Sequence, residues 1–265
     1  MLTITAWILA WTRLPWFSDF QAHTFTPLWL GYIITINALT YRRSGRCMLR
    51  DRLSPFLLLF PVSAGFWWFF EYLNRFVQNW YYVGPVFNPG EYFWYATLPF
   101  STVLPACMGT RDWLLSFSWT QRFFQAFFPI RFSHPQAAAW SVLLIVGAGL
   151  AGIGIWPNYL FPLVWVSPLL IIISIQTILG EPHLFSPITH GDWREIFSSA
   201  SSALVCGLFW EMWNAYSLAK WKYNIPFVHG FEVFEMPVLG YAGYLPFGLV
   251  CAVIGRIVLG KPIDD

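Results

Sequence analysis

The sequence predicts an all-α fold: a polytopic transmembrane helical bundle of about eight helices, arranged as two parallel four-helix repeats. Of the 265 residues, 57% are hydrophobic and 11% are charged, and the mean hydropathy is +0.53. A soluble domain carries about 25% charged residues, so much of this surface is expected to face lipid. The chain is also rich in tryptophan and tyrosine, which favour the membrane–water interface. A similarity between its two halves is the third observation.

Eight apolar segments are expected to span the membrane, because roughly 20 apolar residues cross the bilayer core. The first segment is short and carries Arg13, and the fifth is rich in glycine and alanine, which allow a neighbouring helix to approach closely. The expected spans are residues 3–18, 25–41, 54–74, 92–112, 138–156, 159–179, 196–216 and 236–258.

The spans divide the chain into a first membrane repeat over 1–112 and a second over 138–265. The segment between them, 113–137, is too interrupted by polar residues and proline to span. Its aromatic side chains interleave with Arg122 and Arg131, which is typical of a helix lying in the cytoplasmic interface. This segment is therefore predicted to be an interfacial linker.

Basic residues predict the orientation, because loops rich in lysine and arginine stay in the cytoplasm. The 41–54 connection holds five arginines, and with eight spans the linker, Arg194, Arg256 and Lys261 lie on the same side. Both termini are then expected to be cytoplasmic, in a bacterial inner (cytoplasmic) membrane. A seven-span chain would place the termini on opposite sides.

An internal repeat is indicated by an offset of 141 residues. This offset aligns residues 80–85 (WYYVGP) with 221–226 (WKYNIP). With one residue of slack upstream, Phe69, Glu71 and Asn74 align with Phe209, Glu211 and Asn214. Rare residue types recur in a fixed order, so chance is a poor explanation. Each copy holds an even number of spans, so the copies are expected to share one orientation.

Glu71 and Glu211 are the leading candidates for catalysis, because each stands late in an apolar helix. A carboxylate at membrane depth costs roughly 3 kcal/mol or more unless it is paired or protonated. Asn74 and Asn214 lie three residues further along the same helical faces, where each amide is expected to hydrogen-bond its carboxyl. The alternative is that each glutamate anchors a helix end through a nearby cation such as Lys220.

Aromatic and acidic residues near these carboxyls are expected to contact a substrate and to exclude water. Part of this set lies in the loops 80–91 and 221–235, which are predicted to form an ordered non-cytoplasmic cap, with a plain interfacial belt as the alternative. Because Trp94 stands where the second half has Glu235, the second half is expected to hold the more polar site. The candidates are Trp67, Trp68, Trp80, Tyr82, Glu91, Trp210, Trp213, Trp221, Tyr223, Glu232 and Glu235.

No cofactor, metal or nucleic-acid partner is expected. The net charge is only +2, and the four cysteines form no C-x-x-C pair. His183 and His190 occur near Glu181 and Asp192, but the spacing matches no strong metal motif and favours a turn before the seventh span. Phosphate-loop, dinucleotide-binding and nucleophile-elbow motifs are missing from the sequence.

The repeated blocks resemble the integral membrane lycopene cyclases of the two-copy type. Each half of that family carries a membrane acid, an aromatic element and a Leu-Pro helix. The matching residues here are Glu71, Trp80, Tyr82 and Leu104-Pro105, then Glu211, Trp221, Tyr223 and Leu245-Pro246. After the prolines the chain departs from the family, since Ala106-Cys107 and Phe247-Gly248 replace paired acids. The resemblance implies two similar helical halves and an isoprenoid substrate.

Three classes of function fit these patterns. The first is a membrane-embedded enzyme acting on an apolar isoprenoid or lipid by acid/base chemistry, with membrane lipid and an apolar small molecule as its partners. The second is a proton-coupled transporter, which parallel repeats and broken helices favour but a dry aromatic interior disfavours. The third is a non-catalytic membrane subunit or assembly factor. The sequence identifies no protein partner.

Overall fold

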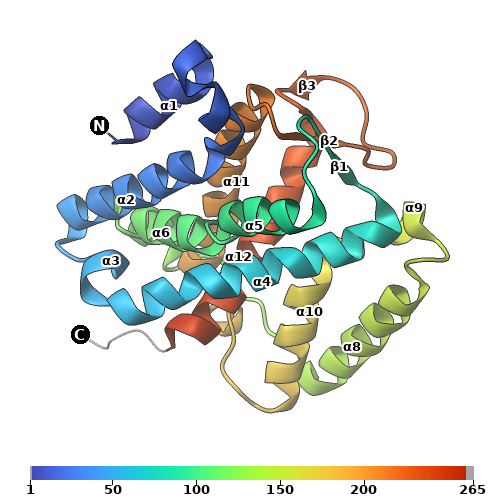
Figure 1. Cartoon of the computed structure of the whole chain (residues 1–265). Helices are drawn as coiled ribbons and strands as arrows, with labels where there is room; N and C mark the ends of the chain where they lie inside the picture. The colour runs from blue at the N-terminus through green and yellow to red at the C-terminus, as the bar shows by residue number, and fades with distance from the viewer. Residues whose placement is uncertain (1, 261–265) are drawn as a thin grey trace.

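The computed structural model describes residues 2–260, and most of them are helical, as the sequence predicts (Figure 1). Lys261, expected on the cytoplasmic side, lies outside the described residues. The first half contains α1 (Leu2–Thr12), the 3₁₀ helix η1 (Pro15–His23), α2 (Phe25–Ser44), α3 (Met48–Asp51), α4 (Leu53–Val77), β1 (Trp80–Val83), α5 (Pro89–Phe100), α6 (Val103–Leu115) and α7 (Ser118–Phe124). The second half contains α8 (Pro135–Gly152), α9 (Pro157–Leu160), α10 (Pro162–Ile178), η2 (Ser186–His190), α11 (Arg194–Ala215), β2 (Lys220–Tyr223), β3 (Glu232–Val233), β4 (Met236–Pro237), η3 (Val238–Gly243) and α12 (Tyr244–Leu259).

Within residues 2–260, three helical segments are long and apolar enough to cross a membrane. They are Leu53–Val77, Pro135–Gly152 and Val238–Leu259. Thr3–Thr12 and Pro162–Ile178 are shorter apolar helices. The expectation of apolar spanning helices is therefore met in part, and the expected eight are not reached by length and composition.

The fourth expected span, 92–112, is broken into α5 and α6. Pro99 stands in the last turn of α5, and a proline nitrogen has no hydrogen to donate to the helix. Hydroxyl groups satisfy the backbone freed at the break. Ser63 Oγ donates to the Phe100 carbonyl at 2.6 Å and accepts from Leu104 N at 3.0 Å, and Thr102 Oγ1 donates to the Pro99 carbonyl at 2.6 Å.

Other expected boundaries also shift where proline or glycine interrupts a helix. The first helix ends at Thr12, and Pro15 begins η1. The eighth expected span starts as β4 and η3 and becomes α-helical at Tyr244. In the predicted 113–137 linker, α6 continues to Leu115 and α7 follows, so the boundary at 112 falls inside a helix. The middle of that linker lies against the η2 region, where Phe127 N donates to the Gly191 carbonyl at 2.8 Å.

The helices pack in matching pairs in the two halves. In the centre, α11 packs on both α6 and α12, and α4 packs on the same two helices. α2 contacts α6 as α10 contacts α12, and α1 contacts α2 as α8 contacts α10. α1 and α8 lie at opposite sides of the molecule (Figure 1). The first residues of α4 and α11 (53 and 194) differ by 141, as do those of α6 and α12 (103 and 244).

Strands β1 and β2 join the two halves as an antiparallel pair. In its register Trp80 faces Tyr223, Tyr81 faces Lys222 and Tyr82 faces Trp221. Because side chains alternate along a strand, one face of the sheet carries Trp80, Tyr82, Trp221 and Tyr223. The register thus brings residues that are 141 positions apart in the sequence to one place.

Candidate functional site

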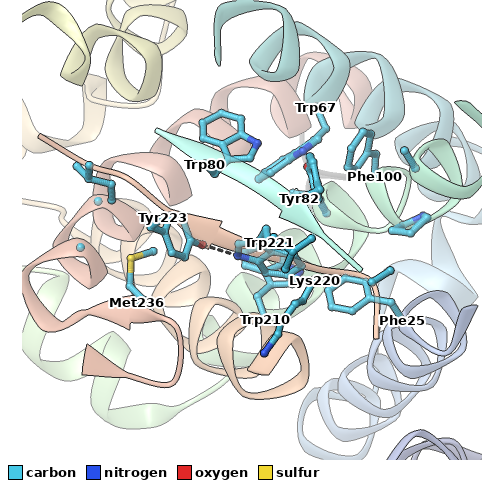
Figure 2. Close-up of a pocket in the computed structure, with 18 of the residues that line it drawn as sticks. Phe25, Trp67, Trp80, Tyr82, Phe100, Trp210, Lys220, Trp221, Tyr223 and Met236 are labelled. Atoms are coloured by element: carbon cyan, nitrogen blue, oxygen red, sulfur yellow. Dashed lines mark hydrogen bonds between the residues drawn. The ribbon is translucent and has the colours of Figure 1, made fainter. Parts of the chain in front are cut away.

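An aromatic cavity of about 500 Å³ lies around the paired strands (Figure 2). Its wall is built from both halves, with rings from α4, β1, α5, α10, α11, β2 and α12. Its size falls within the range of about 300–1,000 Å³ that is usual for small-molecule sites. The helix breaks contribute directly, because Pro99 and Phe100 line it on one side and Gly243 and Tyr244 on the other.

Glu71 on α4 lies behind this wall and bonds to three of its rings. Its Oε1 accepts hydrogen bonds from Trp67 Nε1 at 3.1 Å, Trp80 Nε1 at 3.0 Å and the Tyr82 hydroxyl at 2.5 Å. The donors line the cavity, whereas the Glu71 carboxyl does not. The carboxyl therefore orients the rings of one half and reaches the cavity through Tyr82.

Glu211 on α11 has an equivalent position in the second half. Its Oε1 accepts from the Tyr223 hydroxyl at 2.6 Å and from the Tyr244 hydroxyl at 2.6 Å. Trp221 Nε1 donates to the Tyr223 oxygen at 2.7 Å, the dashed contact in Figure 2. Burial, followed by the neighbouring Glu211 carboxyl, holds the pKa of the Tyr223 hydroxyl well above its ordinary value. Tyr223 thus stays protonated and able to donate.

Asn74 and Asn214 bond to the backbone at the strands and not to the Glu71 and Glu211 carboxyls. Asn74 Nδ2 donates to the Trp80 carbonyl at 2.8 Å, and its Oδ1 accepts from Asn79 N at 2.8 Å. Asn214 makes the same pair of bonds with Trp221, at 2.8 Å to the carbonyl and 2.9 Å from the nitrogen. The chain turns back over each helix end and brings unpaired backbone groups to the amide, which both donates and accepts. These bonds replace the expected Asn–Glu contacts.

Several predicted residues lie away from the cavity wall. Trp68 Nε1 donates to Thr97 Oγ1 at 2.9 Å, and Trp213 packs in the core against Trp29. Glu91 caps the start of α5, and Glu232 is exposed in β3. Trp210 does line the cavity, together with Trp67, Trp80, Tyr82, Trp221 and Tyr223.

The alternative in which cations anchor the two acids is not met among residues 2–260, where neither Glu71 nor Glu211 forms an ion pair with a lysine or arginine. Lys220 binds Glu235 at 2.7 Å instead of Glu211, and Lys222 approaches the same carboxylate at 3.7 Å. The same part of the chain contains no cluster of three or more His, Cys, Asp or Glu able to hold a metal ion. The polar atoms nearest both carboxyls are therefore uncharged ring donors.

Tyr244 bonds to Glu211 and lines the cavity, yet it is not among the residues that the sequence predicts for the site. It starts α12 and reaches Glu211 across a helix crossing at Gly207. A Cβ added to Gly207 would lie 2.5 Å from the Tyr244 ring, so the glycine is what admits this ring. The sequence carries one signal for this contact. Gly207 stands where the first half has Trp67, which indicates that a different side chain packs there.

Comparisons with protein-family models, with curated proteins and with solved structures found no match to this chain.

Proposed function

We propose that this protein is a membrane-embedded enzyme that acts on an apolar isoprenoid or other lipid, using Glu71 and Glu211 for acid/base chemistry. One observation carries the proposal: rings bonded to both carboxyls line the same cavity. The cavity suits an apolar ligand because its wall is mostly aromatic. A weak resemblance in sequence to two-copy lycopene cyclases points to an isoprenoid.

The chemistry would pass through tyrosine hydroxyls, since these groups bridge the carboxyls and the cavity. Tyr82 serves Glu71, and Tyr223 and Tyr244 serve Glu211. A hydroxyl both donates and accepts, so it is able to move a proton between a carboxyl behind the wall and a ligand in front of it. The faces of the wall tryptophans would stabilise positive charge that develops on the ligand.

The proposal includes two duplicated halves of four spans each, in a bacterial inner membrane with both termini cytoplasmic. The equal spacing of α4 with α11 and of α6 with α12 supports duplication. The matched helix pairs and the register of β1 with β2 support it as well. Buried polar residues of α11, such as Ser198 and Ser202, face protein rather than lipid, which lowers the hydropathy of a central span without removing it from the bundle.

Loss of the Glu211 carboxyl is expected to abolish the lipid change that the wild-type protein causes in an expression host. Glu211→Gln removes the proton but keeps the size of the side chain, and general acid/base catalysis contributes roughly 100- to 10,000-fold in rate. Extracted lipids and pigments are profiled for the wild type, Glu211→Gln and Glu71→Gln.

Glu232→Gln is the matched control, because this carboxyl is exposed and lies outside the cavity wall. It should give the wild-type profile. If Glu211→Gln also gives that profile, the enzymatic role is rejected. Proton flux in vesicles that requires both buried acids would instead favour the carrier.

A further inference from the structure

The two carboxyl sites share one plan, yet their donors differ in chemistry. In the first half, indole N–H groups of Trp67 and Trp80 donate to Glu71 beside one hydroxyl. In the second half, both donors to Glu211 are hydroxyls, and the indole of Trp221 donates to Tyr223 instead of to the acid.

A reciprocal exchange of residues produces this difference. The alignment that pairs Glu71 with Glu211 also pairs Trp67 with Gly207, and the 141-residue offset pairs Val103 with Tyr244. In the first half Trp67, on the helix that carries the acid, donates to Glu71. In the second half the equivalent position is Gly207, and Tyr244 of α12 donates to Glu211.

Indoles and hydroxyls differ in what they do for a proton. An indole N–H is a donor only, so Trp67 and Trp80 stabilise a carboxylate and provide no route along which a proton leaves it. A tyrosine hydroxyl donates and accepts, so Tyr223 and Tyr244 each provide such a route to the cavity. Glu71 is thus surrounded mainly by groups that favour its anion, and Glu211 by groups that exchange protons with it.

Burial and the lack of a paired cation also characterise Glu211. Glu211 is 0% exposed, and its Oε2 has no hydrogen-bond partner in the described part of the chain. Glu235 is a charged neighbour of Glu211, and neither it nor the lysines that bind it are paired with Glu211. A buried carboxylate without a paired cation costs far more than the neutral acid.

From this geometry we infer a division of labour that rests on the proposed function: Glu211 holds the proton and delivers it to the ligand through Tyr244 or Tyr223, whereas Glu71 is a carboxylate fixed by indole donors. In the delivery step the Tyr244 hydroxyl turns from Glu211 to the ligand, and its O–H bond breaks as its proton passes to an electron-rich carbon or oxygen of the ligand. The Glu211 proton, carried on Oε1, passes to the Tyr244 oxygen 2.6 Å away, and Glu211 is left as the carboxylate. The ligand gains one proton and one positive charge. The Glu71 carboxylate stabilises this charge and then removes it by taking a proton from the ligand through Tyr82.

Infrared spectroscopy of the purified full-length protein in lipid nanodiscs tests the assignment without any substrate. At neutral pH the wild type should show the C=O band of a protonated carboxyl. Glu211→Gln should abolish this band and Glu71→Gln should leave it. Tyr244→Phe should keep the band but move it to higher frequency, because the carboxyl loses a hydrogen bond.

Trp67→Phe is the matched control, since it removes a donor from Glu71 alone and should leave the band in place. Loss of the band in Glu71→Gln, or a wild type without such a band, would overturn the assignment. If the band of the purified protein behaves as expected but expression never changes the lipids of the host, the proposed reaction is rejected and the protonation assignment stands. Where the lipid change is observed, loss of both hydroxyls in a Tyr223→Phe and Tyr244→Phe double variant should slow it roughly 100-fold, because both routes are then removed.

Discussion

Replacing Gly248 with alanine is expected to destabilise the protein strongly, by about 1–3 kcal/mol or more. Gly248 lies on α12 against the backbone of α11. A Cβ added there would lie 2.1 Å from the Ser199 carbonyl oxygen and 3.0 Å from Ala203 Cβ. No flexible side chain is available to move aside, so the helices themselves must separate. Because this crossing carries Glu211 and Tyr244, the second carboxyl site should be disturbed as well.

Thermal unfolding in detergent, followed by circular dichroism, measures this effect. Gly65→Ala in α4 is the matched control, because a Cβ at that helical glycine meets no atom within 4 Å. Alanine there should be neutral or stabilising by up to about 1 kcal/mol, since it restricts the unfolded chain. Equal melting temperatures for the two variants would contradict the close packing of α11 on α12.

Removing the amide of Asn74 or Asn214 is expected to cost about 2–4 kcal/mol and to release the corresponding strand. Each amide satisfies a buried carbonyl and a backbone nitrogen at the start of β1 or in β2, and each group left unpaired costs about 1–3 kcal/mol. Release of either strand would also remove Trp80 and Tyr82, or Trp221 and Tyr223, from the cavity wall. Alanine should therefore abolish ligand binding and lower the stability.

Hydrogen exchange separates strand release from a general loss of stability. In Asn74→Ala and Asn214→Ala, amides of 79–83 and 220–224 should exchange faster, while amides at the centre of α6 and α12 change less. Asn158→Ala, at an exposed position in α9, should match the wild type. Undiminished protection of both strands in the first two variants would show that other contacts hold the sheet.

The residues that recur in the sequence explain which parts of the site were predictable. Glu71, Glu211 and the Trp-x-Tyr elements recur in a fixed order, and the structure gathers these rings on one cavity. The pairing of β1 with β2 was not predictable, because strands about 140 residues apart carry no local signal for each other. The same holds for Tyr244, whose contact with Glu211 depends on the missing Cβ of Gly207.

Helix boundaries were less predictable than helix existence. Apolar composition marks a helix but does not show where proline and hydroxyl groups divide it, as between α5 and α6. Hydropathy also does not distinguish a serine facing another helix from one facing water. The buried serines of α11 and the buried Asn37 and Thr40 of α2 illustrate this limit.

Photocrosslinking with a diazirine-bearing isoprenoid shows whether one cavity between the two halves takes the apolar ligand. The purified protein is irradiated with the probe, digested and mapped by mass spectrometry, with excess unlabelled isoprenoid as competitor. We expect competed labels within 80–103 and 210–247, which contribute lining residues from both halves. Labels confined to the outer faces of α8 and α1, and insensitive to competitor, would contradict this expectation.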